Sequence, residues 1–97
     1  MQFNGKQKRF LQALGQSLKP IISVGKSGVK DNTLVSVNNA FNTKELIKVK
    51  IQDGCEESKE DVAQKIQSGT AADVVQIIGR TILLYKPHKD NPKIELP

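Results

Sequence analysis

The sequence is poor in the residues that build enzyme centres and metal sites. It contains one cysteine, one histidine and no tryptophan among 97 residues. Cys55 has no partner for an internal disulfide, and with His88 as the only histidine it cannot complete a zinc site. His88 also lies in a proline-rich segment, which disfavours a Ser-His or Cys-His nucleophile pair in a fixed core. We therefore expect a protein that is not an enzyme, uses no metal or cofactor, and works in a reduced, cytoplasmic setting.

Long apolar runs are missing as well. No stretch approaches the ~18 residues that a membrane-spanning helix needs, so a transmembrane protein is excluded. The first residues lack the apolar region and small-residue cleavage site of a secretion signal. A chain of under ~100 residues has room for one core. We expect a single domain over residues 1–97, with its core at about 6–86 and an extended surface tail at 87–97.

Acidic residues are scarce in the first half of the chain. Residues 1–50 contain nine lysines and arginines and two acids, whereas residues 51–97 contain six bases and eight acids. The first half therefore supplies the net charge of +5, and its positive field attracts nucleic acid or an anionic membrane. A membrane binder needs an exposed amphipathic basic helix, but the apolar stripe of the first predicted helix is needed for the core. Nucleic acid is the preferred partner, and an ordinary solvated surface is the alternative.

Apolar periodicity predicts helices that alternate with strands. The first helix spans residues 6–19 and ends before Pro20. Its core stripe, about 100° wide, contains Phe3, Phe10, Leu11, Leu14 and Leu18. A short β-branched strand follows at 21–24, and a second helix begins near residue 29.

The second half continues the alternation. Residues 45–52 alternate as a strand, and Ser58 caps a third helix that we expect to stop at Gly69. Two apolar strands at 74–78 and 81–86 form a hairpin through a Gly-Arg turn. The order α-β-α-β-α-β-β predicts an α/β fold, a two-layer α+β domain with helices packed on a small sheet.

A Gly-x-x-Gly turn, Gly25-Lys26-Ser27-Gly28, joins the first strand to the second helix. The two glycines have no side chains, so another backbone can approach the turn closely at these positions. The amides of the turn and of the first helical turn then favour a phosphate, to which Lys26 adds a charge and Ser27 a hydroxyl donor. A complete P-loop is absent because Pro20 occupies its first glycine position, so an NTPase is rejected. The alternative is a tight strand-to-helix connection without a ligand.

Basic residues from distant parts of the sequence extend this candidate site. Lys30 lies one turn along the second helix, and the strand at 45–52 places Lys48 and Lys50 on one face with Leu46. The polar side of the first helix adds Lys8, Arg9 and Lys19. We expect these bases to converge with the turn into a single cationic groove that follows a phosphate backbone.

Aromatic residues are too few for a base-stacking platform. Phe3, Phe10, Phe41 and Tyr85 are the four in the sequence, and we expect the three phenylalanines on core faces. This argues against domains that stack bases on exposed rings. The second helix is not dense in the Arg, Asn and Gln of a major-groove reader, although its asparagines leave double-stranded DNA open. A Gly-x-x-Gly backbone clamp favours RNA.

Four segments, in order and spacing, resemble the CRM domain family. They are Leu18-Lys19-Pro20, residues 22–28, residues 45–50, and residues 75–79 with 83–85. The resemblance covers about residues 6–86 and is in particular to the bacterial stand-alone, YhbY-like ribosome-associated proteins. It implies a compact domain with a small four-stranded mixed sheet, similar to the C-terminal domain of translation initiation factor three.

The resemblance also implies RNA binding through the Gly-x-x-Gly loop and the adjoining basic surface. In bacteria it implies association with precursors of the large ribosomal subunit, which makes ribosomal RNA the partner. Ser27 departs from the glycine-rich middle of the family's loop and should stiffen it slightly. We expect a monomeric protein that assists ribosome assembly. The alternatives are an intron-splicing factor, disfavoured because no second CRM copy is present, and a module that docks on a ribosomal protein through an apolar patch at Leu46.

Overall fold

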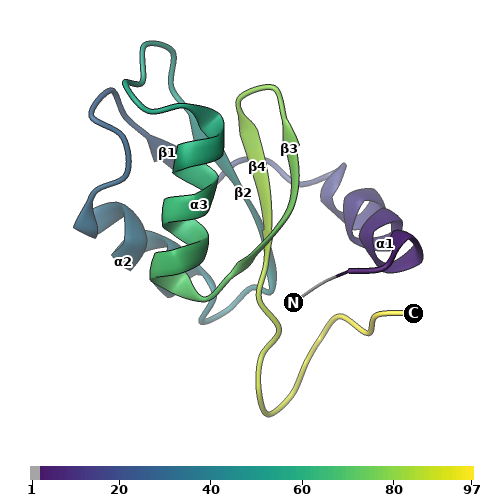
Figure 1. Ribbon diagram of the computed structural model, residues 1–97. Coiled ribbons are helices and arrows are strands. Elements are labelled where there is room, and N and C mark those ends of the chain that lie inside the picture. The colour runs from purple at the N-terminus through teal and green to yellow at the C-terminus, as the bar shows by residue number, and fades with distance from the viewer. Residues whose placement is uncertain (1–2) are drawn as a thin grey trace.

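Three helices and four strands follow one another in residues 3–97, the part of the chain that the computed structural model describes (Figure 1). Their bounds are α1 Gly5–Gly15, β1 Ile22–Val24, α2 Asp31–Ala40, β2 Leu46–Ile51, α3 Lys59–Thr70, β3 Asp73–Ile78 and β4 Thr81–Tyr85. The predicted order of elements and fold class are confirmed. Within residues 3–97, no helix combines the length and apolar character needed to cross a membrane.

The strands form one mixed sheet in the order β1-β2-β4-β3. β1 and β2 run parallel because α2 carries the chain back between them, whereas β4 is antiparallel to both of its neighbours. Gly79 has a φ of 56° and makes the tight turn from β3 to β4, as predicted. The carboxyl ends of β1 and β2, at Val24 and Ile51, lie at the same edge of the sheet. The Gly-x-x-Gly loop begins at this edge.

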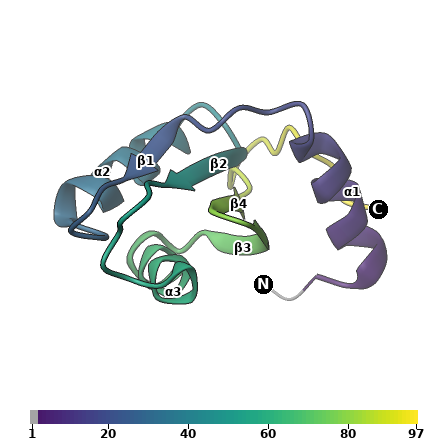
Figure 2. The same ribbon diagram turned by 90° about the horizontal axis from the view of Figure 1, so that it is seen from above.

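Helices α2 and α3 cover one face of the sheet and enclose the larger core (Figure 2). β2 supplies its alternate residues to this core: Ile47, Val49 and Ile51. The prediction that Gly69 ends α3 is wrong, because the helix continues to Thr70 and Ala71 then takes a left-handed φ of 59°. Gly69 instead lets α2 approach α3, since a Cβ there would lie 2.7 Å from the Leu34 side chain.

Helix α1 packs on the opposite face and adds a partial third layer to the predicted two (Figure 2). Leu11 is fully buried there, in a second core that also contains Leu46, Val75, Leu83 and Tyr85. The contact is narrow, because Leu11 and Gly15 are the buried residues of α1. Phe10 and Leu14 were expected in the core, but they stay 37% and 40% exposed.

The first helix also ends earlier than predicted, at Gly15 instead of residue 19. The N–H groups of Gln16 and Leu18 bond to carbonyls three residues back, at Ala13 and Gly15. Such tight turns end an α-helix before a proline is reached. The segment before β1 is therefore a loop, and it carries Lys19.

The C-terminal residues 86–97 form no helix or strand, but they are fixed to the domain. Glu45 is buried, and its carboxylate accepts bonds from the backbone N–H groups of His88, Lys93 and Ile94 at 2.6 to 2.7 Å. Ile94 and Leu96 pack against the second core. The tail is thus docked on the surface, and the apolar contacts extend beyond the predicted limit of residues 6–86.

The clamp at Glu45 makes tail docking sensitive to acid. Burial by itself raises the pKa of Glu45, but the three backbone hydrogen bonds to its charged form prevail and lower the pKa below the ordinary value of 4.5. A carboxyl group whose pKa is lower in the folded than in the unfolded protein stabilises the fold at pH values above its pKa in the unfolded protein. This stability is lost as the pH falls through the pKa of the folded protein. We expect the amide resonances of His88, Lys93 and Ile94 to shift together below pH 4.5. Glu45→Gln should remove this titration; if the variant shows the same shifts, another group controls the tail.

Candidate nucleic-acid interface

The Gly-x-x-Gly loop lies between the end of β1 and the start of α2. A turn closes it, because the N–H of Gly28 donates to the carbonyl of Gly25 at 3.1 Å. The carbonyl of Lys26 accepts from the N–H of Glu56 at 2.8 Å, so the loop is tied to the segment between β2 and α3. The side chains of Lys26 and Ser27 are exposed at the tip. The loop thus presents one cation and one hydroxyl to solvent from a fixed backbone.

The fold requires glycine at residue 28 of the loop but not at residue 25. Gly28 has a φ of 82°, and a Cβ there would collide with the carboxylate of Glu57. Both the backbone conformation and the space therefore demand glycine at this position. Gly25 has no positive φ, and a Cβ there would meet nothing within 4 Å. The fold does not require glycine at residue 25, which leaves an open approach to the backbone.

Glu57 already occupies part of the anion position that we expected a phosphate to fill. Its Oε1 accepts from the N–H of Val29 at 2.7 Å, and its carboxylate pairs with Lys65. The N–H of Lys30 is also used, by the hydroxyl of Thr33 at 3.1 Å. The expectation that these amides are free for phosphate is therefore corrected. Nothing in the sequence distinguishes Glu57 from the neighbouring Glu56, so its role was not predictable.

The uncovered part of the sheet face on the α1 side brings two of the predicted lysines together. Lys50 pairs with Ser23 and Thr81, and Lys48 pairs with Leu83, so both lysines project to this face. We call this surface the open sheet face and define it by six residues beyond α1: Ser23, Lys48, Lys50, Gln76, Ile78 and Thr81. None of the six is acidic, and neither α1 nor β2 contains an acid.

Of the remaining predicted bases, Lys19 and Lys30 do not join this face. Lys8 and Arg9 are exposed on α1. Lys30 lines a hollow with Asp61 and Lys65 between α2 and α3, on the other side of the sheet. Lys19 lies beside Leu46, at the start of β2. A six-residue strand, roughly 20 Å long, separates that end from the Gly-x-x-Gly loop. The structure thus places Lys48 and Lys50 on one face of the sheet, near the edge from which the loop with Lys26 begins, and leaves Lys19 and Lys30 apart.

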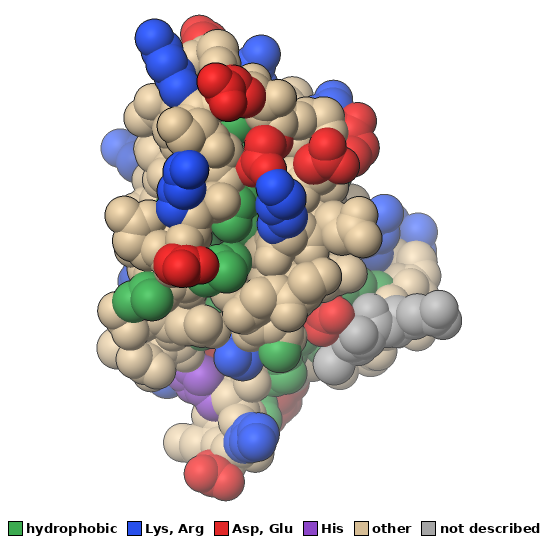
Figure 3. Space-filling model, turned by 60° about the vertical axis from the view of Figure 1, so that its left-hand side comes forward, with side chains coloured by type: hydrophobic (Ala, Val, Ile, Leu, Met, Phe, Trp, Pro, Cys, Tyr) green, Lys and Arg blue, Asp and Glu red, His purple; other side chains and the backbone are tan. Residues whose placement is uncertain are grey.

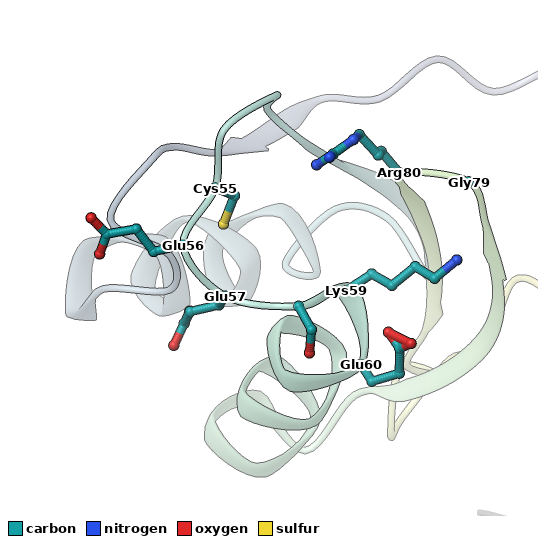
Figure 4. Close-up of a pocket in the computed structure, with 8 residues that line it drawn as sticks. Cys55, Glu56, Glu57, Lys59, Glu60, Gly79 and Arg80 are labelled. Atoms are coloured by element: carbon teal, nitrogen blue, oxygen red, sulfur yellow. The ribbon is translucent and has the colours of Figure 1, made fainter.

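The side of the molecule formed by α2 and α3 is mixed in charge. Figure 3 shows lysines and arginines interspersed with acids on this side. A hollow between the segment before α3 and the β3–β4 turn contains Glu56, Glu57 and Glu60, with Arg80 extending toward that segment (Figure 4). Arg80 pairs with Asp53 at 3.3 Å. No group of acids, cysteines and histidine within residues 3–97 is arranged to hold a metal ion. Lys59 also lines this hollow, so its charge is mixed, and its acids offset the attraction of its bases for a polyanion.

Two predictions about apolar residues are also tested by the structure. Leu46, on which the protein-docking alternative depended, is 7% exposed because it belongs to the second core. That alternative loses its proposed patch. Phe41 is buried and Phe3 stacks edge-on against Tyr85 with ring centroids 5.9 Å apart, whereas Phe10 is partly exposed on α1. The prediction that all three phenylalanines are core residues is therefore wrong for Phe10.

Comparison with known proteins gives consistent results over nearly the whole chain. The family model for the CRS1 / YhbY (CRM) domain matches residues 3–86. The chain is 50% identical over 93 residues to the Bacillus subtilis protein named "Probable RNA-binding protein YqeI", covering 96% of this chain and 97% of that one. It is 39% identical over 92 residues to an "RNA-binding protein" of Haemophilus influenzae, covering 95% and 92%. The solution structure of the Staphylococcus aureus protein SAV1595 superposes with a TM-score of 0.82 at 34% identity, covering 99% of this chain and 100% of that one.

Proposed function

This chain belongs to the CRS1/YhbY (CRM) domain family, and from that premise we propose that it binds RNA and has no catalytic activity of its own. The observation that carries the proposal is a cationic surface without acids. Lys48 and Lys50 lie on the open sheet face, and the chain has no carboxylate side chain before Asp31. No acid among the six residues of the open sheet face weakens its attraction to phosphates.

The proposed RNA path follows the open sheet face and continues over the tip of the Gly-x-x-Gly loop. Lys50 and Lys26 are exposed and supply ammonium groups for phosphates along this path. The open approach to the backbone at Gly25 lets a ribose-phosphate unit lie against the loop. Glu57 accepts a hydrogen bond from the Val29 amide, so its role on this path is to position the loop without contacting RNA.

The bare backbone at Gly25 gives this path a specific test. We expect Gly25→Val to leave the thermal unfolding temperature within a few degrees of wild type, because the side chain enters open space. Affinity for single-stranded RNA should fall about tenfold, because the branched side chain stands where the strand must approach. Electrophoretic mobility shift and thermal unfolding measure the two quantities. Unchanged RNA affinity in a stable Gly25→Val protein would place the strand elsewhere.

For the RNA class, we propose ribosomal RNA within the precursor of the large subunit, bound by a monomer in the cytoplasm during ribosome assembly. The assignment to ribosomal RNA and ribosome assembly is supported by the resemblance to the bacterial stand-alone members of the family. Cross-linking in cells, followed by sequencing of the attached RNA, tests it. Reads should concentrate in large-subunit precursor RNA. A library dominated by introns or messenger RNA would contradict the ribosomal part and leave RNA binding in place.

A further inference from the structure

A small groove separates α1 from the open sheet face. Gln12 of α1 and Gln16, which directly follows this helix, line one wall. Gln76 and Ile78 of β3 line the other, and Lys48 of β2 lies between them. The groove has a volume of about 260 Å³, below the ~300–1,000 Å³ of typical small-molecule sites. It has room for a single planar ring system but not for a larger ligand.

Three glutamine side chains give this groove its polar character. Within residues 3–97, the carboxamides of Gln12, Gln16 and Gln76 make no hydrogen bond to the protein. Each carboxamide offers both donors and an acceptor. A phosphate can only accept from their NH2 groups, whereas a nucleobase edge presents donors and acceptors together and uses the carboxamide oxygens as well. The chemistry of the groove therefore differs from that of the lysines around it.

Apolar groups complete the surroundings that a base requires. Leu83 lines the groove, and Ile78 is 55% exposed at its edge, although it is a large apolar residue. Leu83 is 3% exposed and forms the floor of the groove, so the methyl groups of Ile78 are the ones that can cover the face of an unstacked ring while the carboxamides contact its edge. Sequence-specific recognition of single-stranded RNA uses this combination of face and edge contacts.

The groove is also continuous with the proposed phosphate path. Lys48 belongs to both, and Lys50 lies two residues further along the same strand face, ~7 Å away. A nucleotide whose phosphate is held at Lys48 or Lys50 would therefore have the groove within reach of its base.

We propose that the groove between α1 and the open sheet face receives one base of the bound RNA strand and favours adenine. A glutamine carboxamide can contact the adenine N6 amino group and N7 together, through its acceptor and donor. The proposal rests on the proposed function, because the lysines must first hold the strand. It adds base selectivity, which phosphate contacts alone cannot provide.

The test compares two single-stranded RNAs of equal length, an all-uridine strand and the same strand with one central adenosine. Wild-type protein should bind the adenosine-containing strand about tenfold more tightly, the effect of one good bidentate contact. Gln12→Ala/Gln16→Ala places alanine, a good helix former, in α1 and at its C-cap, and it should remove this preference while affinity for the all-uridine strand is retained. Gln64→Ala is the matched control, because this exposed glutamine lies on α3 across the sheet.

The outcomes separate this proposal from the one on which it rests. Failure of wild-type protein to bind either strand overturns the proposed function and the base site together. Binding of both strands with equal affinity, or a glutamine variant that weakens both equally, overturns the base site alone. Loss of the adenosine preference in Gln64→Ala also overturns it, since that residue is remote from the groove.

Discussion

Reversing the charges of Lys26 and Lys50 together is expected to weaken RNA binding about 100-fold. Both side chains are exposed and form no ion pair within residues 3–97, so Lys26→Glu/Lys50→Glu should fold normally. Each lost charge-assisted contact costs about 1.5 kcal/mol or more, and two give the stated factor. Loss of two single-strand phosphate contacts should also flatten the plot of log K against log[salt] by ~1.4. Fluorescence anisotropy titrations at several salt concentrations measure both effects.

The control for this prediction is a second pair of lysines at the other end of the sheet. Lys19→Glu/Lys44→Glu changes the net charge by the same amount, and both residues line a hollow at the start of β2. We expect this control to reduce affinity only weakly, through the long-range field. Equal losses in the two double variants would mean that net charge, and not the surface beside the loop, determines binding.

Replacing Gly28 by alanine is expected to destabilise the fold by about 3 kcal/mol. A left-handed conformation costs a residue with a Cβ ~1–2 kcal/mol, and the collision with Glu57 must also be relieved. For a domain of this size, such a loss lowers the thermal unfolding temperature by about 12–24 °C. Differential scanning calorimetry measures the change. The matched substitution Gly25→Ala should leave the temperature almost unchanged, because its Cβ enters open space.

A double variant separates the two costs at residue 28. Glu57→Ala removes the colliding carboxylate together with its bond to the Val29 amide. Gly28→Ala should therefore cost less in the Glu57→Ala background than in the wild type, with only the conformational part remaining. An undiminished cost in that background would show that the carboxylate moves aside freely and that the backbone conformation alone requires glycine.

Local patterns were enough to predict the elements of the fold. The alternation in residues 45–52, the Ser58 cap and the Gly79 turn each depend on residues close in sequence, and the structure has all three. The alternation also placed Lys48 and Lys50 on one face, because a strand has a period of two. The strand pairing that sets Lys50 beside Ser23 and Thr81 is not local, and no pattern within the chain specified it.

The contacts that shape the site come from residues that sequence patterns cannot pair. Glu57 reaches Val29 across 28 positions of the chain, and Glu45 holds the amide of Ile94 across 49. The helix dipole already explains acids near the start of a helix, so there was no reason from the sequence to assign Glu57 a separate role. Phe10 followed the apolar stripe of its helix, but the narrow contact of α1 with the sheet leaves it partly exposed.

The anchoring of the loop by Glu57 bears on how fast the protein associates with its partner. Hydrogen bonds fix the Val29 amide and the turn at Gly28 before any ligand binds. The loop therefore loses little conformational entropy when an RNA strand binds. Exposed lysines on a rigid surface also speed diffusional encounter with a polyanion at low ionic strength. Association rates should therefore be similar for different sequences, and discrimination between them should arise from how long each complex survives.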